Sequence, residues 1–350
     1  MSLDFYRGKR VAVTGSTGLI GSYVIKLLVE SEAKVRALTH KRPANEYTKM
    51  AHQVAFCDLT VPGQVHPAMQ DVDVVVSCAG HTGGVGLNSV DPVGPATAIA
   101  VNVLHACHLA KVPLLGFLSS TTVYSPSEYP VVEDEPDTNE PGGMRPSLGS
   151  TIGGLYPLYA GIGESKRFLE NLHRYYMEKT GIKIAIVRPS GAYGRYDNFD
   201  QSTSHVVPGL INRALALKPG EPFEVWGDGL GVRDLIHAED VARGFLLAIS
   251  KSPNCDPINL ASGRGTTTGE LAQVVLDAVG SKARIVFNPN KPTALRKRLV
   301  SVEKAQRVLR FNAGWDLAGG IADTVRWAND ALSDLQRRIG MFYIWWVTGI

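Results

Sequence analysis

The sequence has few of the features that mark secreted, membrane or metal-binding proteins. Its 350 residues include only four cysteines, and none of them forms a C-x-x-C pair. We therefore expect reduced, partly buried thiols rather than a disulfide framework, and no metal site. No stretch approaches the ~20 apolar residues of a spanning helix. Residues 1–20 also lack the charged-then-apolar run of a signal peptide. These absences predict a cytoplasmic protein without a membrane partner.

The net charge is also small. The chain has 36 basic and 33 acidic residues, a formal charge of +3, and no basic run longer than three residues. This balance argues against nucleic acid as a partner. Apolar residues make up 44% of the chain, which is ordinary for a globular protein. A chain of this length can bury one large core or two modest ones.

A glycine-rich turn stands between the first predicted strand and the first predicted helix. The strand is the β-rich run over residues 10–14, and the amphipathic helix ends near Leu28. Glycines at this spacing allow a tight turn and the close approach of a pyrophosphate, and the helix N-terminus offers free N–H groups. The pattern predicts dinucleotide binding by Gly15, Ser16, Thr17, Gly18, Leu19, Ile20 and Gly21.

The second predicted strand, over residues 34–38, ends in cations. It is followed by Thr39, His40, Lys41 and Arg42. NAD enzymes place a carboxylate here for the ribose hydroxyls, whereas two fixed cations favour the 2′-phosphate of NADP. We therefore expect NADP, with NAD as the second choice. The alternative is that these residues form a solvated basic turn.

Strands and helices alternate along the first half of the chain. The fourth predicted strand begins at Asp73, is apolar throughout and ends in Ala79 and Gly80, as expected of a parallel sheet covered on both faces. The alternation predicts a Rossmann-type doubly wound α/β fold. Residues 1–188 would bind the dinucleotide. Residues 189–340 would form a smaller substrate lobe, with some segments returning to the first domain. Residues 341–350 are a docking or dimer segment, or foreign to the natural chain.

A later stretch resembles a known catalytic helix. Residues 163–170 read G-E-S-K-R-F-L-E, which is similar to the Y-G-x-S-K-x-x-x-E pattern of the extended short-chain dehydrogenases/reductases, the NAD-dependent epimerase/dehydratase family. In that family a tyrosine precedes the catalytic lysine by four residues, but Ile162 stands there in this chain. The resemblance implies that Lys166 holds the nicotinamide ribose. It also implies that Asp58, with Leu59 beside it, contacts the adenine, and that Asn102 matches a family asparagine.

The strand from Leu114 to Tyr124 resembles the S-S-x-x-V-Y segment of the same family. The match implies that Ser120 is the catalytic hydroxyl, able to hold the reacting oxygen of a sugar. Thr122 falls where GDP-L-fucose synthases and GDP-mannose 3,5-epimerases have an acid/base cysteine. A threonine hydroxyl exchanges protons poorly near neutral pH, so this departure disfavours epimerisation.

Residues 193–213 carry the most specific likeness. They resemble the GDP-L-fucose synthase stretch Y-G-P-x-D-N-F…S-H-V-I-P-A-L-x-x-R. The resemblance implies that His205 is an acid/base residue and that Arg213 contacts the nucleotide diphosphate. A second match, W-G-D-G-x-x-x-R-D, implies that Arg233 binds the diphosphate. The substrate residues expected from the resemblance are Gly83, Gly84, Asn198, His205, Val206, Arg213, Trp226 and Arg233.

The missing tyrosine leaves three possibilities open. Tyr159 lies one helical turn before Ile162 and about 10 Å from Lys166 along a regular helix. It could be a relocated acid if Gly161 and Gly163 loosen the start of the helix. Otherwise His205 acts alone, or the chemistry has been lost. A polar stretch over residues 128–154 precedes this helix and is expected to form an ordered lid.

The resemblance covers about residues 9–335 and implies a homodimer acting on a nucleotide sugar. Our first hypothesis is an NADP-dependent oxidoreductase acting on a GDP-linked 4-keto hexose, with an altered proton donor. The second is an epimerase or dehydratase that keeps NAD bound and uses it transiently. The third is a nucleotide-sugar or dinucleotide binding protein without turnover.

Overall fold

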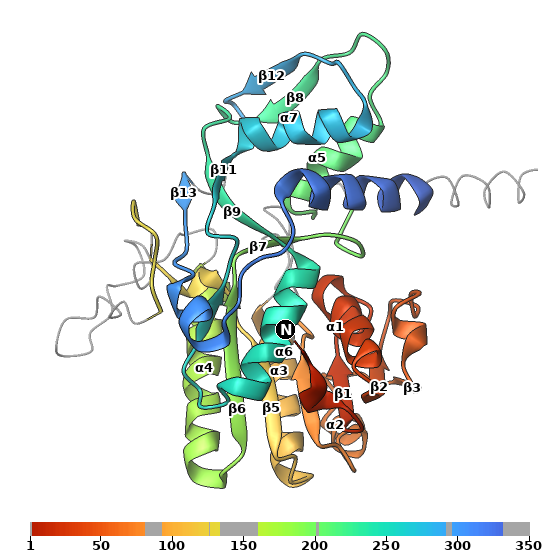
Figure 1. Ribbon diagram of the computed structural model, residues 1–350, viewed down its shortest axis with the longest axis vertical. Coiled ribbons are helices and arrows are strands. Elements are labelled where there is room, and N and C mark those ends of the chain that lie inside the picture. The colour runs from red at the N-terminus through yellow and green to blue at the C-terminus, as the bar shows by residue number, and fades with distance from the viewer. Residues whose placement is uncertain are drawn as a thin grey trace, which may run out of the picture.

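The computed structural model describes residues 2–80, 93–125, 127–133, 160–200, 203–291 and 296–331. It has a larger lobe, built on a parallel sheet, and a smaller lobe beyond one end of that sheet (Figure 1). Four short helices, η1 (Asp4–Tyr6), η2 (Thr48–Met50), η4 (Thr121–Val123) and η7 (Ala305–Leu309), lie around the larger lobe in the described part of the chain. No helix in the described part of the chain is long and apolar enough to cross a membrane.

The large sheet has seven strands, all parallel. Their spatial order is β10-β6-β5-β4-β1-β2-β3. The order reverses beside β1, because the chain passes from β3 on one side of it to β4 on the other. Ligands of such sheets bind at the carboxyl ends of the strands next to this reversal. The strands are β1 (Arg10–Thr14), β2 (Lys34–Thr39), β3 (Gln53–Phe56), β4 (Val74–Ser77), β5 (Leu114–Leu118), β6 (Lys183–Pro189) and β10 (Ile258–Leu260).

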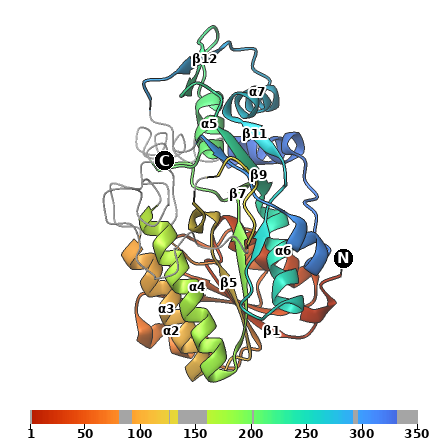
Figure 2. The ribbon, with the colours of Figure 1, turned by 90° about the vertical axis from the view of Figure 1, so that its left-hand side faces the viewer.

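Helices cover both faces of the sheet, which confirms the predicted Rossmann-type fold. On one face α1 (Leu19–Glu30) packs beside α6 (Ala238–Lys251). On the other face lie α2 (Pro62–Ala68), α3 (Val93–Leu109) and α4 (Ala160–Thr180) (Figure 2). All four residues of β4 are buried, because a central strand between two helical layers meets no solvent. Each large apolar side chain buried in these layers contributes ~1.5–3 kcal/mol.

Late segments of the chain return to the larger lobe. Helix α6 packs so closely on β5 that a Cβ atom at Gly116 would lie 2.3 Å from Ile249. Strand β10 then joins the sheet beside β6 through Ile258, Asn259 and Leu260. Residues 238–260 therefore belong to the larger lobe, although the chain has already entered the smaller lobe before them.

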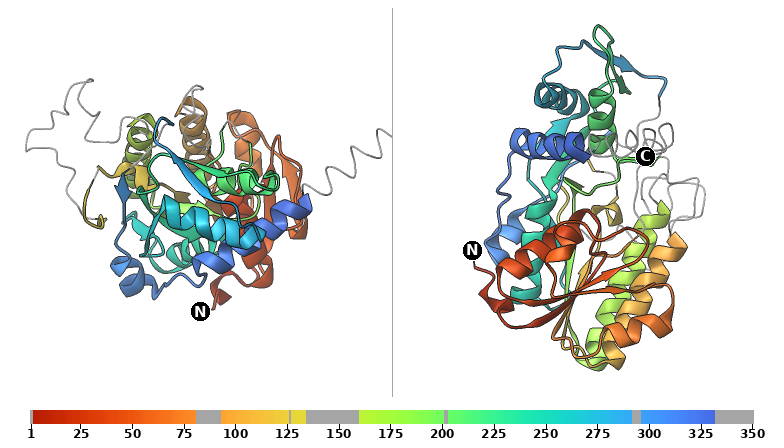
Figure 3. Two further views of the ribbon diagram at one scale, coloured as in Figure 1. Left: turned by 90° about the horizontal axis from the view of Figure 1, so that it is seen from above. Right: turned by 90° about the vertical axis from the view of Figure 1, so that its right-hand side faces the viewer.

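The smaller lobe lies over the carboxyl end of the large sheet (Figure 3). Strand β6 leads into it through β7 (Gly191–Tyr193), which pairs with β9 (Val232–His237). Helices α5 (Val206–Leu215) and α7 (Thr268–Val279), strand β8 (Phe223–Trp226) and a helix over residues 317–331 bury a separate core. A Thr267–Glu270 capping box starts α7. The remaining strands of the lobe are β11 (Gly265–Thr267), β12 (Ile285–Asn288) and β13 (Lys297–Arg298).

Candidate active site

The glycine turn lies at the carboxyl end of β1, beside β4. Gly15 has a φ of +64°, and a Cβ atom there would lie 2.7 Å from the backbone nitrogen of Ala79. A Cβ atom at Gly21 would lie 2.2 Å from the carbonyl oxygen of Gly15. Helix α1 begins after Gly18 without a side-chain cap and without an acidic residue in its first turn. The turn therefore leaves the helix N–H groups and their partial positive charge to an anionic ligand, which fits a dinucleotide.

Two further contacts hold this turn in shape. The Ser16 hydroxyl donates to the carbonyl oxygen of Leu38 at 2.6 Å, and the Thr48 hydroxyl donates to that of Ser16 at 2.8 Å. Thr17, Leu19 and Ile20 continue the turn into α1. The glycine turn is therefore tied to the loop that follows β2.

The predicted cation cluster lies in that loop, and Lys41 and Arg42 are both exposed. His40 lies 3.5 Å from the carboxylate of Asp58. Hydrogen bonds from the hydroxyl and N–H of Thr60 lower the pKa of Asp58. No carboxylate follows β2 directly, as the sequence indicates, but Asp58 places one near His40. Leu59 is buried, and its carbonyl accepts a 2.9 Å hydrogen bond from Asn102.

Ser120 and Thr122 lie just after β5. Ser120 precedes the short helix η4 (Thr121–Val123), and Thr122 is the second residue of that helix. The Ser120 hydroxyl caps this short helix by accepting from the backbone N–H of Thr122 at 3.1 Å. The Thr122 hydroxyl oxygen is buried and has no hydrogen-bond partner within the described residues. The capping bond uses only an acceptor position of Ser120, so its hydroxyl proton remains available to a bound oxygen.

Lys166 reaches the same strand end from α4. Its ammonium group donates to the carbonyl of Leu118 at 2.8 Å and lies 4.9 Å from the centre of the Phe117 ring. Burial lowers the pKa of Lys166 to about 8, although the carboxylate of Glu170 acts in the opposite direction. An amine with a pKa near neutrality is typical of a functional site. The structure therefore brings Lys166 to the strand end that carries Ser120.

A buried ionic network supports this strand end. Arg188 forms two hydrogen bonds to Glu170, at 3.0 and 2.6 Å. Glu170 also accepts from the Ser119 hydroxyl at 2.5 Å. Arg188 donates in addition to the hydroxyl of Tyr124 at 2.9 Å. The network joins α4, β5 and β6, and thereby fixes Lys166 relative to Ser120. The sequence signals for it were the glutamate of the helix pattern and the Arg-Pro dipeptide, but neither identified the pairing.

Within the described part of α4, no tyrosine stands in place of the missing one. Ile162 occupies the expected position on α4. The helix is continuous from Ala160 through Gly161 and Gly163, so these glycines do not loosen it. Tyr159 lies just outside the described residues, as do most of the expected lid, Gly83 and Gly84.

His205 lies at the position before the first residue of α5. Its side chain does not cap the helix. Instead, its Nδ1 lies 3.5 Å from Oδ1 of Asp197, whose side chain is 5% exposed. Asp197 stands in the stretch that resembles GDP-L-fucose synthases, but the sequence assigned it no role. A carboxylate beside one imidazole nitrogen can orient the ring.

Asn198 and Val206 border His205. The Asn198 amide donates to the Thr203 hydroxyl at 2.8 Å, and its carbonyl oxygen accepts from the Asp200 N–H at 3.1 Å. These bonds shape the turn before α5. Val206 is the first residue of the helix and is 40% exposed.

An aromatic and cationic surface lines a hollow of about 330 Å³ in the smaller lobe. Trp226 is 40% exposed. The Arg213 guanidinium lies 5.4 Å from its ring centre, and the Lys291 ammonium group lies 5.6 Å from it. Burial lowers the pKa of Arg213. Lys291 also lines this hollow, and the sequence contained no signal for it, because it follows β12 in an irregular segment.

The structure pairs Arg233 with a second arginine. Strands β9 and β13 are parallel, and their register sets Arg298 beside Arg233. The carboxylate of Asp234 accepts from Ser190, Ser262 and the N–H of Gly263, so it fixes the chain rather than facing a ligand. Two arginines at paired positions of neighbouring strands suit a diphosphate.

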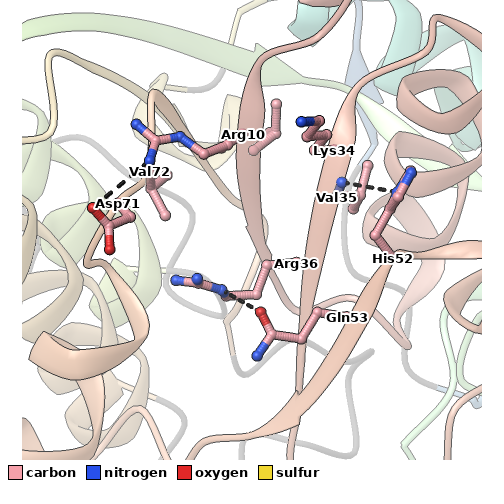
Figure 4. A pocket seen from close by; sticks show the side chains of 9 residues that line it. Arg10, Lys34, Val35, Arg36, His52, Gln53, Asp71 and Val72 are labelled. Atoms are coloured by element: carbon pink, nitrogen blue, oxygen red, sulfur yellow. Dashed lines mark hydrogen bonds and ion pairs between the residues drawn. The ribbon is translucent and has the colours of Figure 1, made fainter.

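A second hollow lies at the opposite end of the strands of the large sheet. It has a volume of about 180 Å³ and is lined by the first residues of β1, β2 and β3 (Figure 4). Arg10 pairs there with Asp71 and Asp73, and Arg36 donates to Gln53. This hollow lies at the amino ends of the strands, whereas the glycine turn, Ser120 and Lys166 lie at the carboxyl ends.

Comparison with known proteins identifies the family of the chain. Residues 11–261 match the NAD dependent epimerase/dehydratase family. The chain belongs to this family, whose members are NAD(P)-dependent enzymes of nucleotide-sugar metabolism.

Curated relatives extend over nearly the whole chain. The chain is 29% identical over 340 residues to a dTDP-4-dehydro-6-deoxy-D-allose reductase of Streptomyces, covering 93% of this chain and 98% of the relative. It is 27% identical over 344 residues to the GDP-L-fucose synthase of Escherichia coli K12, covering 91% and 96%. Among solved structures, a GDP-L-fucose synthetase from Naegleria fowleri superposes with a TM-score of 0.73 at 23% identity, covering 95% and 96%. The UDP-glucose 4-epimerase of Thermotoga maritima superposes with a TM-score of 0.75 at 21% identity, covering 92% and 99%. At these identities the superpositions establish the fold alone.

Proposed function

We propose that the chain is an NADP-dependent oxidoreductase that reduces a nucleotide-linked 4-keto hexose, with GDP as the nucleotide. The observation that carries this proposal is the position of Lys166, whose ammonium group donates to Leu118, two residues before Ser120. The names of two relatives, a reductase of a dTDP-4-dehydro sugar and a GDP-L-fucose synthase, support the substrate class.

Each residue has a role that follows from its position. The hydroxyl of Ser120 donates to the reacting oxygen on the sugar, and Lys166 holds the nicotinamide ribose. NADPH, when bound, supplies the hydride. His205 delivers the proton to the new hydroxyl group, and Asp197 orients its imidazole ring. Tyr159 is the alternative proton donor.

Different residues bind the diphosphate of the substrate, its nucleobase and the 2′-phosphate of the cofactor. Arg233 and Arg298, at paired positions of neighbouring strands, bind the diphosphate. Trp226, between Arg213 and Lys291, offers a flat aromatic surface to the nucleobase. Lys41 and Arg42 bind the 2′-phosphate that distinguishes NADP from NAD.

The deciding experiment follows NADPH oxidation with purified protein. GDP-linked and dTDP-linked 4-keto-6-deoxy-hexoses are offered separately, with the K166M variant as the control. Oxidation that requires Lys166 and is faster with the GDP sugar supports the proposal. Faster oxidation with the dTDP sugar would instead identify dTDP as the nucleotide. No oxidation with either sugar contradicts the proposal.

The two alternatives give different results in the same preparation. NAD that co-purifies and does not exchange indicates an epimerase or dehydratase that uses the cofactor transiently. Binding of NADPH and GDP without turnover indicates a binding protein, and activity gained by I162Y would then identify the missing tyrosine as the cause. The protein is also proposed to be cytoplasmic and to form a homodimer. Light scattering of the purified chain tests the dimer.

A further inference from the structure

Two segments that serve different ligands meet between the lobes. One is the loop after β2, residues 40–47, which carries the cations proposed to bind the 2′-phosphate. The other is the segment after β7, residues 194–198, which leads towards His205. Arg42 donates to the carbonyl oxygen of Tyr196 at 3.5 Å, and Arg195 lies 3.6 Å from the carboxylate of Glu46. The cofactor loop therefore touches the substrate segment directly.

Tyr196 is the centre of this contact. Its hydroxyl donates to Glu46 at 2.8 Å, and its ring packs against those of Tyr47 at 5.5 Å and Trp327 at 5.2 Å. Its φ is +65°, which a bulky residue adopts only where its surroundings hold it. The Arg195–Glu46 pair is more exposed and contributes less. The hydroxyl bond of Tyr196 is thus the main polar link between the segments.

On the substrate side, the contact continues into the proposed proton donor. Asp197 follows Tyr196 and lies 3.5 Å from His205. His205 precedes α5, which carries Arg213 in its last turn. Arg195, on the other side of Tyr196, is anchored to Asp323 by hydrogen bonds of 2.9 and 2.5 Å. A displacement of Tyr196 would therefore move Asp197 and the start of α5.

On the cofactor side, the loop is rooted in the glycine turn. The Asn45 amide donates to the Ser22 hydroxyl at 2.8 Å and to the carbonyl of Thr17 at 3.5 Å. Glu46 is the next residue. A dinucleotide bound at the glycine turn and a phosphate bound to Lys41 and Arg42 would therefore both influence where Glu46 lies. The resembling GDP-L-fucose synthase pattern has proline and an unrestricted residue where this chain has Arg195 and Tyr196. The link therefore lies outside that pattern.

We propose that Tyr196 is a positioning residue that couples the cofactor loop to α5, so that bound cofactor increases the affinity for the nucleotide of the substrate. The inference rests on the proposed function, because it requires NADP at the glycine turn and the nucleotide of the substrate beside α5. By linkage, the nucleotide must increase the affinity for the cofactor by the same factor.

The test measures that factor by calorimetry, with GDP and NADP⁺ as the probes. GDP is titrated into the protein alone and into the protein saturated with NADP⁺. In the wild type, NADP⁺ is expected to strengthen GDP binding by about fivefold or more. Y196F removes only the hydroxyl group and retains the ring packing. In this variant the factor is expected to fall below about twofold, while each ligand alone binds as in the wild type. Y175F, at an exposed tyrosine of α4, is expected to retain the full factor.

Two results would overturn the inference: a wild-type protein in which the ligands bind independently, or a Y196F protein with the wild-type factor. If Y196F binds neither ligand because it fails to fold, E46A takes its place in the test, because it removes the carboxylate that accepts the bond. A wild-type factor in E46A would then overturn the inference. A wild-type protein that binds neither NADP⁺ nor GDP contradicts the proposed function itself. Independent binding of both ligands contradicts only the coupling.

Discussion

At the scale of single residues, the ammonium group of Lys166 has an unusual environment. An unfolded lysine has a pKa near 10.4, whereas burial lowers that of Lys166 to about 8. Between these values the unfolded chain binds more protons than the folded one. The contribution of Lys166 to the free energy of unfolding therefore rises with pH through this window.

The same titration predicts a pH dependence of activity. As the pH rises through about 8, Lys166 loses its charge, and turnover is expected to fall with it. The K166R variant keeps its charge, so its residual rate should stay level between pH 7 and 9. The measurement is the initial rate of NADPH oxidation across this range. An equal decline in wild type and K166R would assign the titration to another group.

His205 gives the second residue-scale prediction. Replacement by asparagine removes the imidazole but leaves Arg213 and Arg233 in place. The turnover number of H205N is expected to fall by about 10²–10⁴-fold, while GDP binding measured by calorimetry stays within about threefold of wild type. H105N, at an exposed histidine of α3, is the matched control. An unchanged turnover number in H205N would indicate that Tyr159 or another group donates the proton.

At the scale of elements, the join between β1 and α1 tolerates no added atoms. A Cβ atom at Gly21 would lie 2.2 Å from the backbone of Gly15. We expect G21A to lower the free energy of unfolding by about 1–3 kcal/mol and to weaken NADP⁺ binding, as measured by urea unfolding and calorimetry. In α2, a Cβ atom at Gly63 would meet nothing within 4 Å. G63A is therefore expected to be neutral or to stabilise by up to about 1 kcal/mol. Equal effects of the two substitutions would contradict this account of the turn.

Elements were predictable where a local pattern defines them. The glycine turn and the apolar run of β4 both lie within short segments whose spacing reflects one turn or one strand. The start of α4 was less predictable. Gly161 and Gly163 left a loosened helix possible, but the helix is regular there, because tertiary packing outweighs the low helix propensity of glycine.

At the scale of the whole molecule, the chain crosses between the two lobes more than once. Helix α6 and strand β10 belong to the large sheet, yet they lie between β9 and β11 of the smaller lobe in sequence. Unfolding of either lobe would therefore disturb the segments that connect it to the other lobe.

We accordingly expect a single unfolding transition in urea. The described tryptophans, Trp226, Trp315 and Trp327, all follow residue 188, so their fluorescence reports on the later part of the chain. Circular dichroism reports on all helices. The two curves should coincide, and NADP⁺ at 100 times its dissociation constant should raise the free energy of unfolding by about 2.7 kcal/mol. Separate midpoints would show that the lobes unfold independently.

The sequence by itself determined the doubly wound fold, the glycine turn and the identity of Ser120, Lys166 and His205 as candidates. The fold and the turn follow from local patterns, because spacing specifies a helix face, a strand or a turn. The three candidates were implied by the resemblance of short motifs to the epimerase/dehydratase family. Only the tertiary structure decided which distant residues meet. Glu46 and Tyr196 are 150 positions apart, and Arg298 reaches Arg233 through a strand register. Such contacts depend on how whole elements pack, and no local pattern encodes that packing.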